Sequence, residues 1–298
     1  MSAKRRHDGD EGDSEHASPP RRQHKSQQRA IGTDRSPEED LQTSVSISFS
    51  SFGSEWFSRG SNALKDIVIF GDSYSSDNLT WSKVGSLGDA LGLSTEHVHN
   101  FAVPGATAEN GLISQIKRYL ANDDQPEDED EDLHPVDGSI DANEQYLEPN
   151  ETLYIIWIGI NDCGNGANDS EAVEEILEEQ VFDEAVHNLY VKAGARNFVF
   201  MDVPPLDRCP AVHGKHPHDL TDRVEAWNCG LMTQIKSFMS PRNRQQTTSV
   251  ILYSMWQTVT DILDSFTGDP WSDDLHLNAE THDIVADRVA EALRSCLS

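Results

Sequence analysis

Short apolar runs alternate with helix-like segments along most of this 298-residue chain, and this alternation constrains its fold more than any other feature. Five runs have the length and composition of buried parallel strands: residues 67–70, 97–103, 153–160, 197–203 and 249–253. Helical periodicity covers residues 84–91, 111–120, 171–193, 221–239 and 279–297. Gly194 follows the third helical segment as its expected C-cap. The alternation predicts one three-layer α/β/α domain with a parallel sheet.

Two polar stretches lie outside this pattern. Residues 1–45 are rich in Ser, Pro, Gln, Arg and Asp and contain almost no large apolar side chains. Such a segment cannot bury enough apolar surface to offset its ordering entropy, so we predict a disordered tail before a domain over residues 46–298. Residues 122–150 include an unbroken acidic run from Glu127 to Asp132. Because like charges this close repel one another, we predict a surface loop there.

The formal net charge of −29 restricts the partners of the chain. Attraction to phosphates needs a positive field, so nucleic-acid binding is not expected, whereas neutral small molecules fit as substrates. No segment is long and apolar enough to span a bilayer, and no apolar stretch follows Met1 as in a secretory signal. We therefore expect an intracellular protein without stable membrane insertion. It would be cytoplasmic, or nuclear if the basic groups at residues 4–6 and 21–22 act as an import signal.

Cysteine and histidine usage gives little sign of a metal site or a disulfide scaffold. The four cysteines form no paired ligand set, and buried or free thiols are favoured over a bridge between Cys209 and Cys229. Three histidines lie together in a loop rich in Gly, Pro and Lys, but no thiolate accompanies them: His213, His216 and His218. We expect the chain to need neither a metal nor an organic cofactor.

Polar residues follow the predicted strands at the points where the strands end. Ser73 comes directly after the first strand, Gly105 after the second and Asn161 after the third. Asp273 and His276 lie in the loop before the last helix. Ligands bind at the carboxyl edge of such sheets, and unrelated turns need not converge on one edge. These five residues therefore predict a functional site.

The residue types at this edge suit acyl transfer. A serine hydroxyl such as that of Ser73 is a weak nucleophile until a neighbouring base removes its proton. His276 is the best candidate base, since the unperturbed pKa of imidazole lies near neutrality. Asp273 can orient that imidazole and stabilise its charged form, and Asp274 is an adjacent rival for the same role.

A tetrahedral intermediate also needs donors for its oxyanion. We expect the backbone N–H groups of Ser73 and Gly105 and the side-chain amide of Asn161 to supply them. Trp157 and Trp271 lie beside the site motifs in the sequence. They could line a sugar-binding wall or pack in the core, and the sequence does not separate these alternatives.

In their order, these blocks resemble the SGNH (GDSL-like) hydrolases, whose name lists the serine, glycine, asparagine and histidine. The resemblance runs from about Asp66 to Leu297, nearly all of the predicted domain. It implies a flavodoxin-like sheet of five parallel strands in the order 2-1-3-4-5. It also assigns catalysis to Ser73, Asp273 and His276, with an oxyanion hole at Ser73, Gly105 and Asn161.

A closer resemblance is to the fungal carbohydrate esterases of family 16, which are acetyl esterases on sugar and xylo-oligosaccharide esters. It is carried by Ile69–Ser75, Trp157–Asp162, Ala193–Val199 and Val203–Arg208. It implies hydrolysis of short-chain, acetyl esters of carbohydrates through an acyl-serine. Leu277 follows His276 where that group usually has Pro, and that group is secreted. The alternatives are a lipid-directed esterase or thioesterase on this scaffold, or a non-catalytic binding protein.

Overall fold

A computed structural model of the chain describes seven stretches of sequence: residues 49–53, 64–76, 87–121, 147–166, 168–212, 218–240 and 248–297. All of them belong to one unit, residues 46–298. The tail expected at residues 1–45 lies outside the described residues, and so do residues 122–146 of the expected acidic loop. Residues 147–150 of that loop lead through a turn into the next strand.

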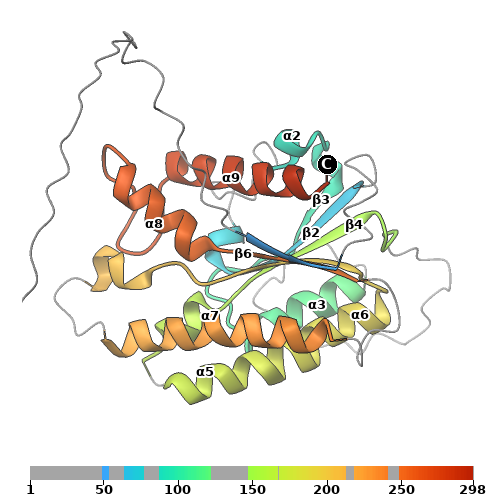
Figure 1. The fold of residues 1–298 in the computed structure, drawn as a ribbon, viewed down its shortest axis with the longest axis horizontal. Helices are drawn as coiled ribbons and strands as arrows, with labels where there is room; N and C mark the ends of the chain where they lie inside the picture. Colours follow the sequence, from blue (N-terminus) through green and yellow to red (C-terminus); the bar gives the residue numbers. More distant parts are fainter. Residues whose placement is uncertain are drawn as a thin grey trace, which may run out of the picture. The chain divides into compact units, whose positions relative to one another are not determined.

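A six-stranded sheet lies between the helical layers (Figure 1). Its strands are β1 (Phe49–Phe52), β2 (Asp66–Gly71), β3 (Val98–Asn100), β4 (Thr152–Trp157), β5 (Asn197–Met201) and β6 (Ser249–Tyr253). Their spatial order is β1-β6-β5-β4-β2-β3. Strands β2 to β6 pair in parallel, which confirms the expected order 2-1-3-4-5 once β2 is counted as the first predicted strand.

The sixth strand, β1, was not predicted. It runs antiparallel to β6, pairing Phe49 with Tyr253 and Phe52 with Val250. Its sequence, FSSF, exposes both serines and half-buries both phenylalanines, so it lacks the alternation by which a strand is recognised. The pairing with β6, about 200 residues later, is what makes this segment a strand.

Burial of the central strands explains their apolar sequences. Every residue of β4, β5 and β6 is buried, and so is every residue of β2 after Asp66. Strands covered on both faces read as continuous apolar runs, as they do here. Because β2 and β4 pair from Asp66 and Thr152 to Gly71 and Trp157, their carboxyl ends finish side by side.

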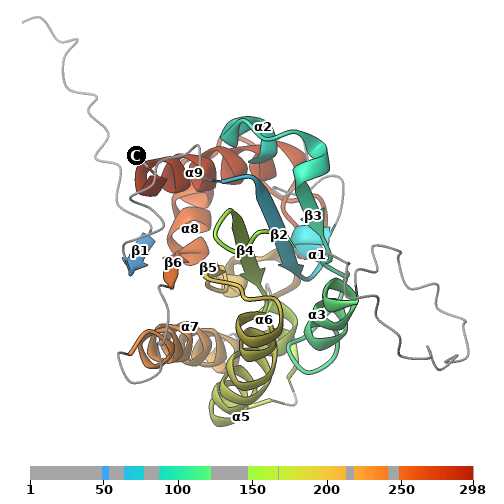
Figure 2. The same cartoon turned by 90° about the vertical axis from the view of Figure 1, so that its right-hand side faces the viewer.

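Helices cover both faces of the sheet (Figures 1 and 2). One face carries α2 (Leu87–Leu91), α8 (Met255–Ser265) and α9 (Ala279–Leu297). The other carries α3 (Leu112–Leu120), α5 (Ser170–Ile176), η4 (Leu177–Val186), α6 (His187–Lys192) and α7 (His218–Phe238). Short turns complete the chain: α1 (Ser73–Ser76), η3 (Thr95–His97), α4 (Ile160–Gly164), η5 (Leu206–Arg208) and η6 (Pro210–Val212). The predicted three-layer α/β/α architecture is confirmed.

Two helical segments differ from the prediction. The helix expected over residues 171–193 consists of α5, η4 and α6 in succession, and η4 is π-helical, with the His187 N–H reaching the Phe182 carbonyl. It ends before Gly194, whose φ of 69° fits the expected C-cap. Helix α8 was not predicted, although Ser254 caps it by accepting from the Gln257 N–H.

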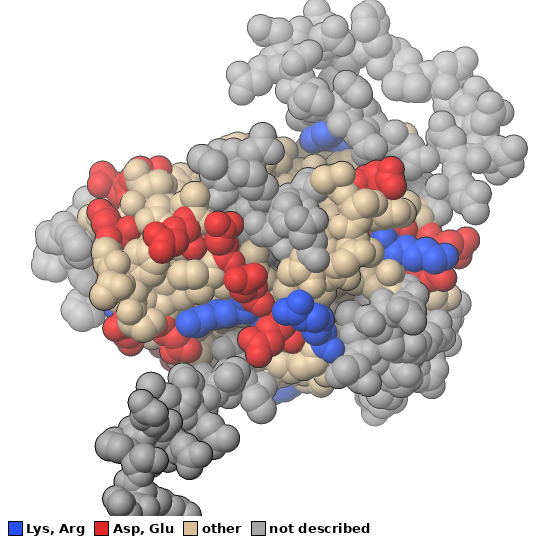
Figure 3. Space-filling view, turned by 90° about the horizontal axis from the view of Figure 1, so that it is seen from above, with Lys and Arg blue, Asp and Glu red and all other residues tan. Residues whose placement is uncertain are grey.

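The surface over α9 is acidic. Figure 3 looks onto the face formed by α2, α8 and α9 and shows patches of Asp and Glu with Lys and Arg between them. The exposed side of α9 contributes Glu280, Asp283, Asp287 and Glu291. The same helix carries Arg288 and Arg294, so its acidic side chains exceed its basic ones, in line with the sign of the net charge of the whole chain.

Candidate active site

The end of β2 is fixed before the chain reaches Ser73. The Gly71 N–H donates to Oε1 of the buried Gln115 at 2.9 Å, and Nε2 of Gln115 donates to the Gly71 carbonyl at 2.8 Å. A Cβ at Gly71 would lie 2.5 Å from the Trp157 carbonyl oxygen on β4. Only glycine therefore fits between the two strand ends, and α3 holds it there.

Asp72 shapes the turn that presents Ser73. Its Oδ1 accepts from the Tyr74 N–H at 3.0 Å, and its carbonyl accepts from the Ser75 N–H at 3.0 Å. Burial above all, together with the nearby Asp162, raises the pKa of Asp72 to about 7, although the Tyr74 N–H acts to lower it. The carboxyl beside the nucleophile is therefore largely protonated below neutral pH.

Ser73, His276 and Asp273 form a hydrogen-bonded chain, although Ser73 and His276 are 203 residues apart. Nε2 of His276 lies 2.9 Å from Oγ of Ser73, and Nδ1 lies 2.8 Å from Oδ2 of Asp273. The other oxygen of Asp273, Oδ1, accepts from the backbone N–H groups of Leu275 at 2.8 Å and His276 at 2.6 Å. This is the order of contacts that activation of a serine requires.

Asp273 is ionised at every pH near neutrality. Partial desolvation acts to raise its pKa, but the N–H groups of His276 and Leu275 and the imidazole outweigh it and lower the pKa to about 2. An ionised carboxylate on Nδ1 is the state that stabilises a positively charged imidazole. Asp274, the rival in the sequence, is exposed, and its carbonyl accepts from the Ala211 N–H at 2.8 Å.

The loop after β3 runs beside the start of α1. The Val103 N–H donates to the Gly71 carbonyl at 3.1 Å, and Nδ2 of Asn100 donates to the Ser75 carbonyl at 2.6 Å. Gly105 follows in an exposed turn with a φ of 75°, a conformation that glycine adopts without strain. Residues on both sides of Ser73 are thus bonded either to the last residue of β3 or to the loop after it, which carries Gly105.

Two bridges tie the same loop to α4. Nδ2 of Asn161 donates to the Ala106 carbonyl at 2.9 Å, and both carboxylate oxygens of Asp162 accept from the Ala108 N–H, at 3.0 and 3.2 Å. A primary amide has two N–H donors, so Asn161 keeps one beyond its bond to Ala106. The strand ends that carry Ser73, Gly105 and Asn161 therefore form one connected edge.

Comparison with known proteins fits this arrangement. The sequence profile described as GDSL-like lipase/acylhydrolase matches residues 67–289, about three quarters of the chain. The chain belongs to the GDSL-like family. This confirms the family expected from the sequence, and the match begins one residue into β2 and ends within α9.

Individual relatives of this GDSL-family chain share only a minority of its residues. An acetylesterase from Thermothelomyces thermophilus is 32% identical in an alignment 181 residues long, which covers 50% of this chain and 56% of that protein. The chain thus spans about half the length of this curated relative. A protein from Parabacteroides merdae, described as GDSL-like, shares the fold, with a TM-score of 0.50 and 13% identity over 78% of this chain and 98% of that one.

A second solved structure is a lipolytic protein of the G-D-S-L family from Veillonella parvula. Its TM-score is 0.48 at 15% identity, and the alignment covers 76% of this chain and 97% of that one.

The two tryptophans expected near the site lie in different environments. Trp157 is completely buried, and its indole N–H donates to the Asp202 carbonyl at 3.1 Å. It cannot line a sugar-binding wall in this GDSL-family chain, so the core-packing alternative is the correct one. Trp271 is partly buried at the start of the His276 loop, where it pairs with Leu277.

Sequence reasoning missed Tyr74. This side chain is 2% exposed, and its hydroxyl donates to the Leu275 carbonyl at 2.6 Å. Its ring centroid lies 5.6 Å from that of His276 and 5.4 Å from that of Trp157. The signal that could have found it is its place directly after Ser73.

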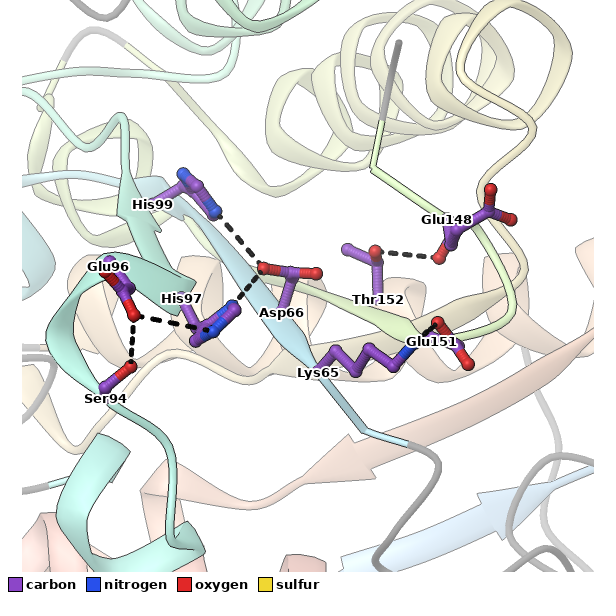
Figure 4. Close-up of polar contacts among 9 residues, drawn as sticks. All are labelled: Lys65, Asp66, Ser94, Glu96, His97, His99, Glu148, Glu151 and Thr152. Carbon is purple, nitrogen blue, oxygen red and sulfur yellow. Dashed lines mark hydrogen bonds and ion pairs between the residues drawn. The ribbon is translucent and has the colours of Figure 1, made fainter.

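The opposite edge of the sheet carries polar residues in a different arrangement (Figure 4). Oδ1 of Asp66, at the start of β2, lies 2.8 Å from Nδ1 of His97 and 3.5 Å from Nε2 of His99. The hydroxyl of Ser94 donates to Glu96 at 3.2 Å, and Glu96 lies 3.9 Å from Nε2 of His97. The hydroxyl of Ser94 thus bonds Glu96 at this edge of the sheet, whereas the hydroxyl of Ser73 bonds the His276 imidazole at the other.

Within the part of the chain that the structure describes, no group of three or more His, Cys, Asp or Glu residues could hold a metal ion. His213, His216 and the His218 side chain lie outside the described residues. Cys209 and Cys229, which the sequence left open as a pair, are both free, as are Cys163 and Cys296. None of the described helices has the length and apolar character needed to cross a membrane.

Proposed function

We propose that this chain hydrolyses carboxylic esters, with Ser73 as the nucleophile, His276 as the general base and Asp273 as the residue that orients the base. The observation that carries the proposal is the pair of contacts on the His276 imidazole: 2.9 Å to Ser73 Oγ and 2.8 Å to Asp273 Oδ2. Both distances are within the reach required for proton transfer and orientation. The family of the chain points to the same class of reaction.

The proposed reaction has two halves. His276 takes the hydroxyl proton as Ser73 Oγ attacks the ester carbonyl, and the resulting oxyanion accepts hydrogen bonds from the Ser73 and Gly105 N–H groups and the Asn161 amide. The intermediate collapses to an acyl-serine as His276 returns the proton to the leaving alcohol. Water then attacks the acyl group, His276 takes its proton, and the acid leaves as Ser73 regains its hydrogen.

The proposed substrate is a small, neutral ester with a short acyl group. An acetylated carbohydrate is the first such ester to assay. The relative from Thermothelomyces thermophilus, named an acetylesterase, supports the acetyl group. The exposed carboxylates of Asp273 and Asp274 in the base loop support a neutral substrate, because they would repel an anionic one. The intracellular location expected from the sequence stays a prediction.

A lipid-directed esterase is the second candidate, because the family description includes lipases. The acyl-chain preference separates the two. A short-chain esterase should turn over p-nitrophenyl acetate faster than longer esters and should release acetate from acetylated xylo-oligosaccharides. Activity that rises with acyl length would instead favour a lipid-directed esterase.

The first prediction concerns the nucleophile. Ser73→Ala should abolish release of p-nitrophenol from p-nitrophenyl acetate, a loss on the order of a thousandfold or more, since Ser73 is the one hydroxyl among the described residues that is bonded to the His276 imidazole. Ser94→Ala is the matched control, because Ser94 bonds Glu96 at the other edge of the sheet, and its activity should stay at the wild-type level.

Two results would count against the proposal. The first is unchanged turnover in Ser73→Ala. The second is failure of a fluorophosphonate to label Ser73 in the folded wild-type chain, which would support the non-catalytic binding alternative.

A further inference from the structure

The base of the proposed triad is carried by an exposed loop. The side chains of Asp273 and His276 are 56% and 35% exposed. Within the loop, the N–H and hydroxyl of Ser272 donate to the His276 carbonyl at 2.8 and 3.1 Å. These bonds set the internal shape of the loop, but they do not fix its distance from Ser73.

Besides the contact between Ser73 and His276, two hydrogen bonds within the described part of the chain reach residues 273–276 from elsewhere in the fold. The Ala211 N–H donates to the Asp274 carbonyl at 2.8 Å, and the Tyr74 hydroxyl donates to the Leu275 carbonyl at 2.6 Å. The second bond is distinctive because its donor is the residue directly after Ser73 and its acceptor is the residue directly before His276. It therefore links the residues next to Ser73 and His276, between whose side chains the proton must pass.

Tyr74 is itself held firmly. Its N–H donates to Oδ1 of Asp72 at 3.0 Å, and its ring packs edge-on against Trp157 at 5.4 Å and His282 at 6.0 Å. A side chain buried among these partners has one orientation, so its hydroxyl is a fixed point for the loop. Burial also raises the pKa of Tyr74 well above its ordinary value, which keeps the hydroxyl a donor at any working pH.

We propose that Tyr74 is a positioning residue that sets the distance between Ser73 and His276. Its hydroxyl holds Leu275, and its ring, 5.6 Å from the imidazole, supports one side of His276. Proton transfer needs a separation of about 2.6–3.2 Å, and a misplacement of about 1 Å can cost a hundredfold in rate. The inference rests on the proposed hydrolase function.

The test compares two tyrosine-to-phenylalanine variants of the full chain. Tyr74→Phe removes the bond to Leu275 and leaves the ring in place. Tyr119→Phe is the control, because Tyr119 is also buried and its hydroxyl shares a 2.9 Å hydrogen bond with that of Tyr154, away from the triad. Both variants lose one buried tyrosine hydroxyl, so both should lower the melting temperature.

Only Tyr74→Phe should change catalysis. We expect its kcat on p-nitrophenyl acetate to fall about tenfold to a hundredfold while KM stays within about twofold, because the loss is in proton transfer and not in binding. The rate at which a fluorophosphonate labels Ser73 should fall in parallel. A wild-type kcat in Tyr74→Phe, or an equal loss in Tyr119→Phe, would overturn the proposal.

A structural measurement separates this proposal from the proposed function. The ring-proton NMR signals of His276 report its position whether or not the chain turns over an ester. They should move in Tyr74→Phe and stay in place in Tyr119→Phe. If they do not move, Tyr74 does not position the base; if they move and the wild type has no esterase activity, the positioning role stands and the hydrolase function fails.

Discussion

The contacts of single atoms distinguish two neighbouring aspartates that the sequence left as rivals. Asp273 gives one carboxylate oxygen to the His276 imidazole and the other to two backbone N–H groups. Asp274 instead joins the rest of the fold through its backbone carbonyl. With a pKa near 2, Asp273 keeps its charge over the whole range in which an esterase would be assayed. Loss of activity at mildly acidic pH would therefore have to come from another group.

This difference predicts unequal effects of two matched substitutions. Asp273→Asn should lower kcat on p-nitrophenyl acetate by roughly a thousandfold or more, since an amide neither fixes the imidazole tautomer nor stabilises its charge. Asp274→Asn should stay within about twofold of the wild type. Equal losses in the two variants, measured at neutral pH, would show that Asp273 is not the triad acid.

At the scale of elements, the corner between β4 and α4 decides where Asn161 lies. The apolar run continues through Ile158 and Ile160, both buried, which is why the sequence predicted a strand to residue 160. The strand ends at Trp157 because Gly159 turns the chain with a φ of 115°. Trp227 of α7 packs onto this corner, and a Cβ at Gly159 would lie 2.3 Å from its ring.

Gly159→Ala should therefore destabilise the fold by about 2–4 kcal/mol, from the sum of a backbone conformation disfavoured for alanine and a clash with a buried ring. Gly164→Ala is the control, because Gly159 directly precedes α4 and Gly164 is the last residue of that helix. A Cβ at Gly164 meets no atom within 4 Å, so this change should alter stability by less than about 1 kcal/mol. Urea unfolding of both variants checks the difference, and equal midpoints would refute it.

At the scale of the whole molecule, buried carboxyl groups make stability depend on pH. Burial raises the pKa of Asp72 and Asp202 to about 7 and that of Asp162 to about 6. The unfolded chain releases these protons near pH 4, whereas the folded chain keeps them. Their contribution to stability is therefore complete below about pH 4 and is lost as the pH rises through 6 and 7.

The free energy of unfolding should thus fall between about pH 4.5 and 7, by up to about 1.4 kcal/mol per pH unit for each group. The acidic surface acts in the same direction, because repulsion grows as carboxylates ionise. Urea unfolding at constant high salt screens that surface term. Under those conditions Asp72→Asn should make the free energy of unfolding fall less steeply with pH. A free energy of unfolding that rises in the wild type between about pH 4.5 and 7 would contradict the expected role of the buried carboxyl groups.

Local patterns in the sequence were enough to predict most of the architecture. Buried parallel strands read as apolar runs and helices as periodic ones, because each pattern follows from which faces of an element meet the core. The order of the five parallel strands came from the family resemblance, and the structure agrees with it. Their places after the strands and before the last helix singled out Ser73, Gly105, Asn161, Asp273 and His276, and the resemblance pointed to the same five residues.

Only the tertiary structure decided the features that depend on contacts far apart in the sequence. Segment β1 is a strand because β6 pairs with it, and Trp157 belongs to the core because its indole meets the Asp202 carbonyl. The bond from Tyr74 to Leu275 spans 201 residues. No local period or propensity encodes such pairs, because each depends on where the folded chain brings the partner. The sequence by itself determined most of the helices and strands and the chemistry of the residues at their ends. Packing decided which side chains meet, and it also made a strand of β1.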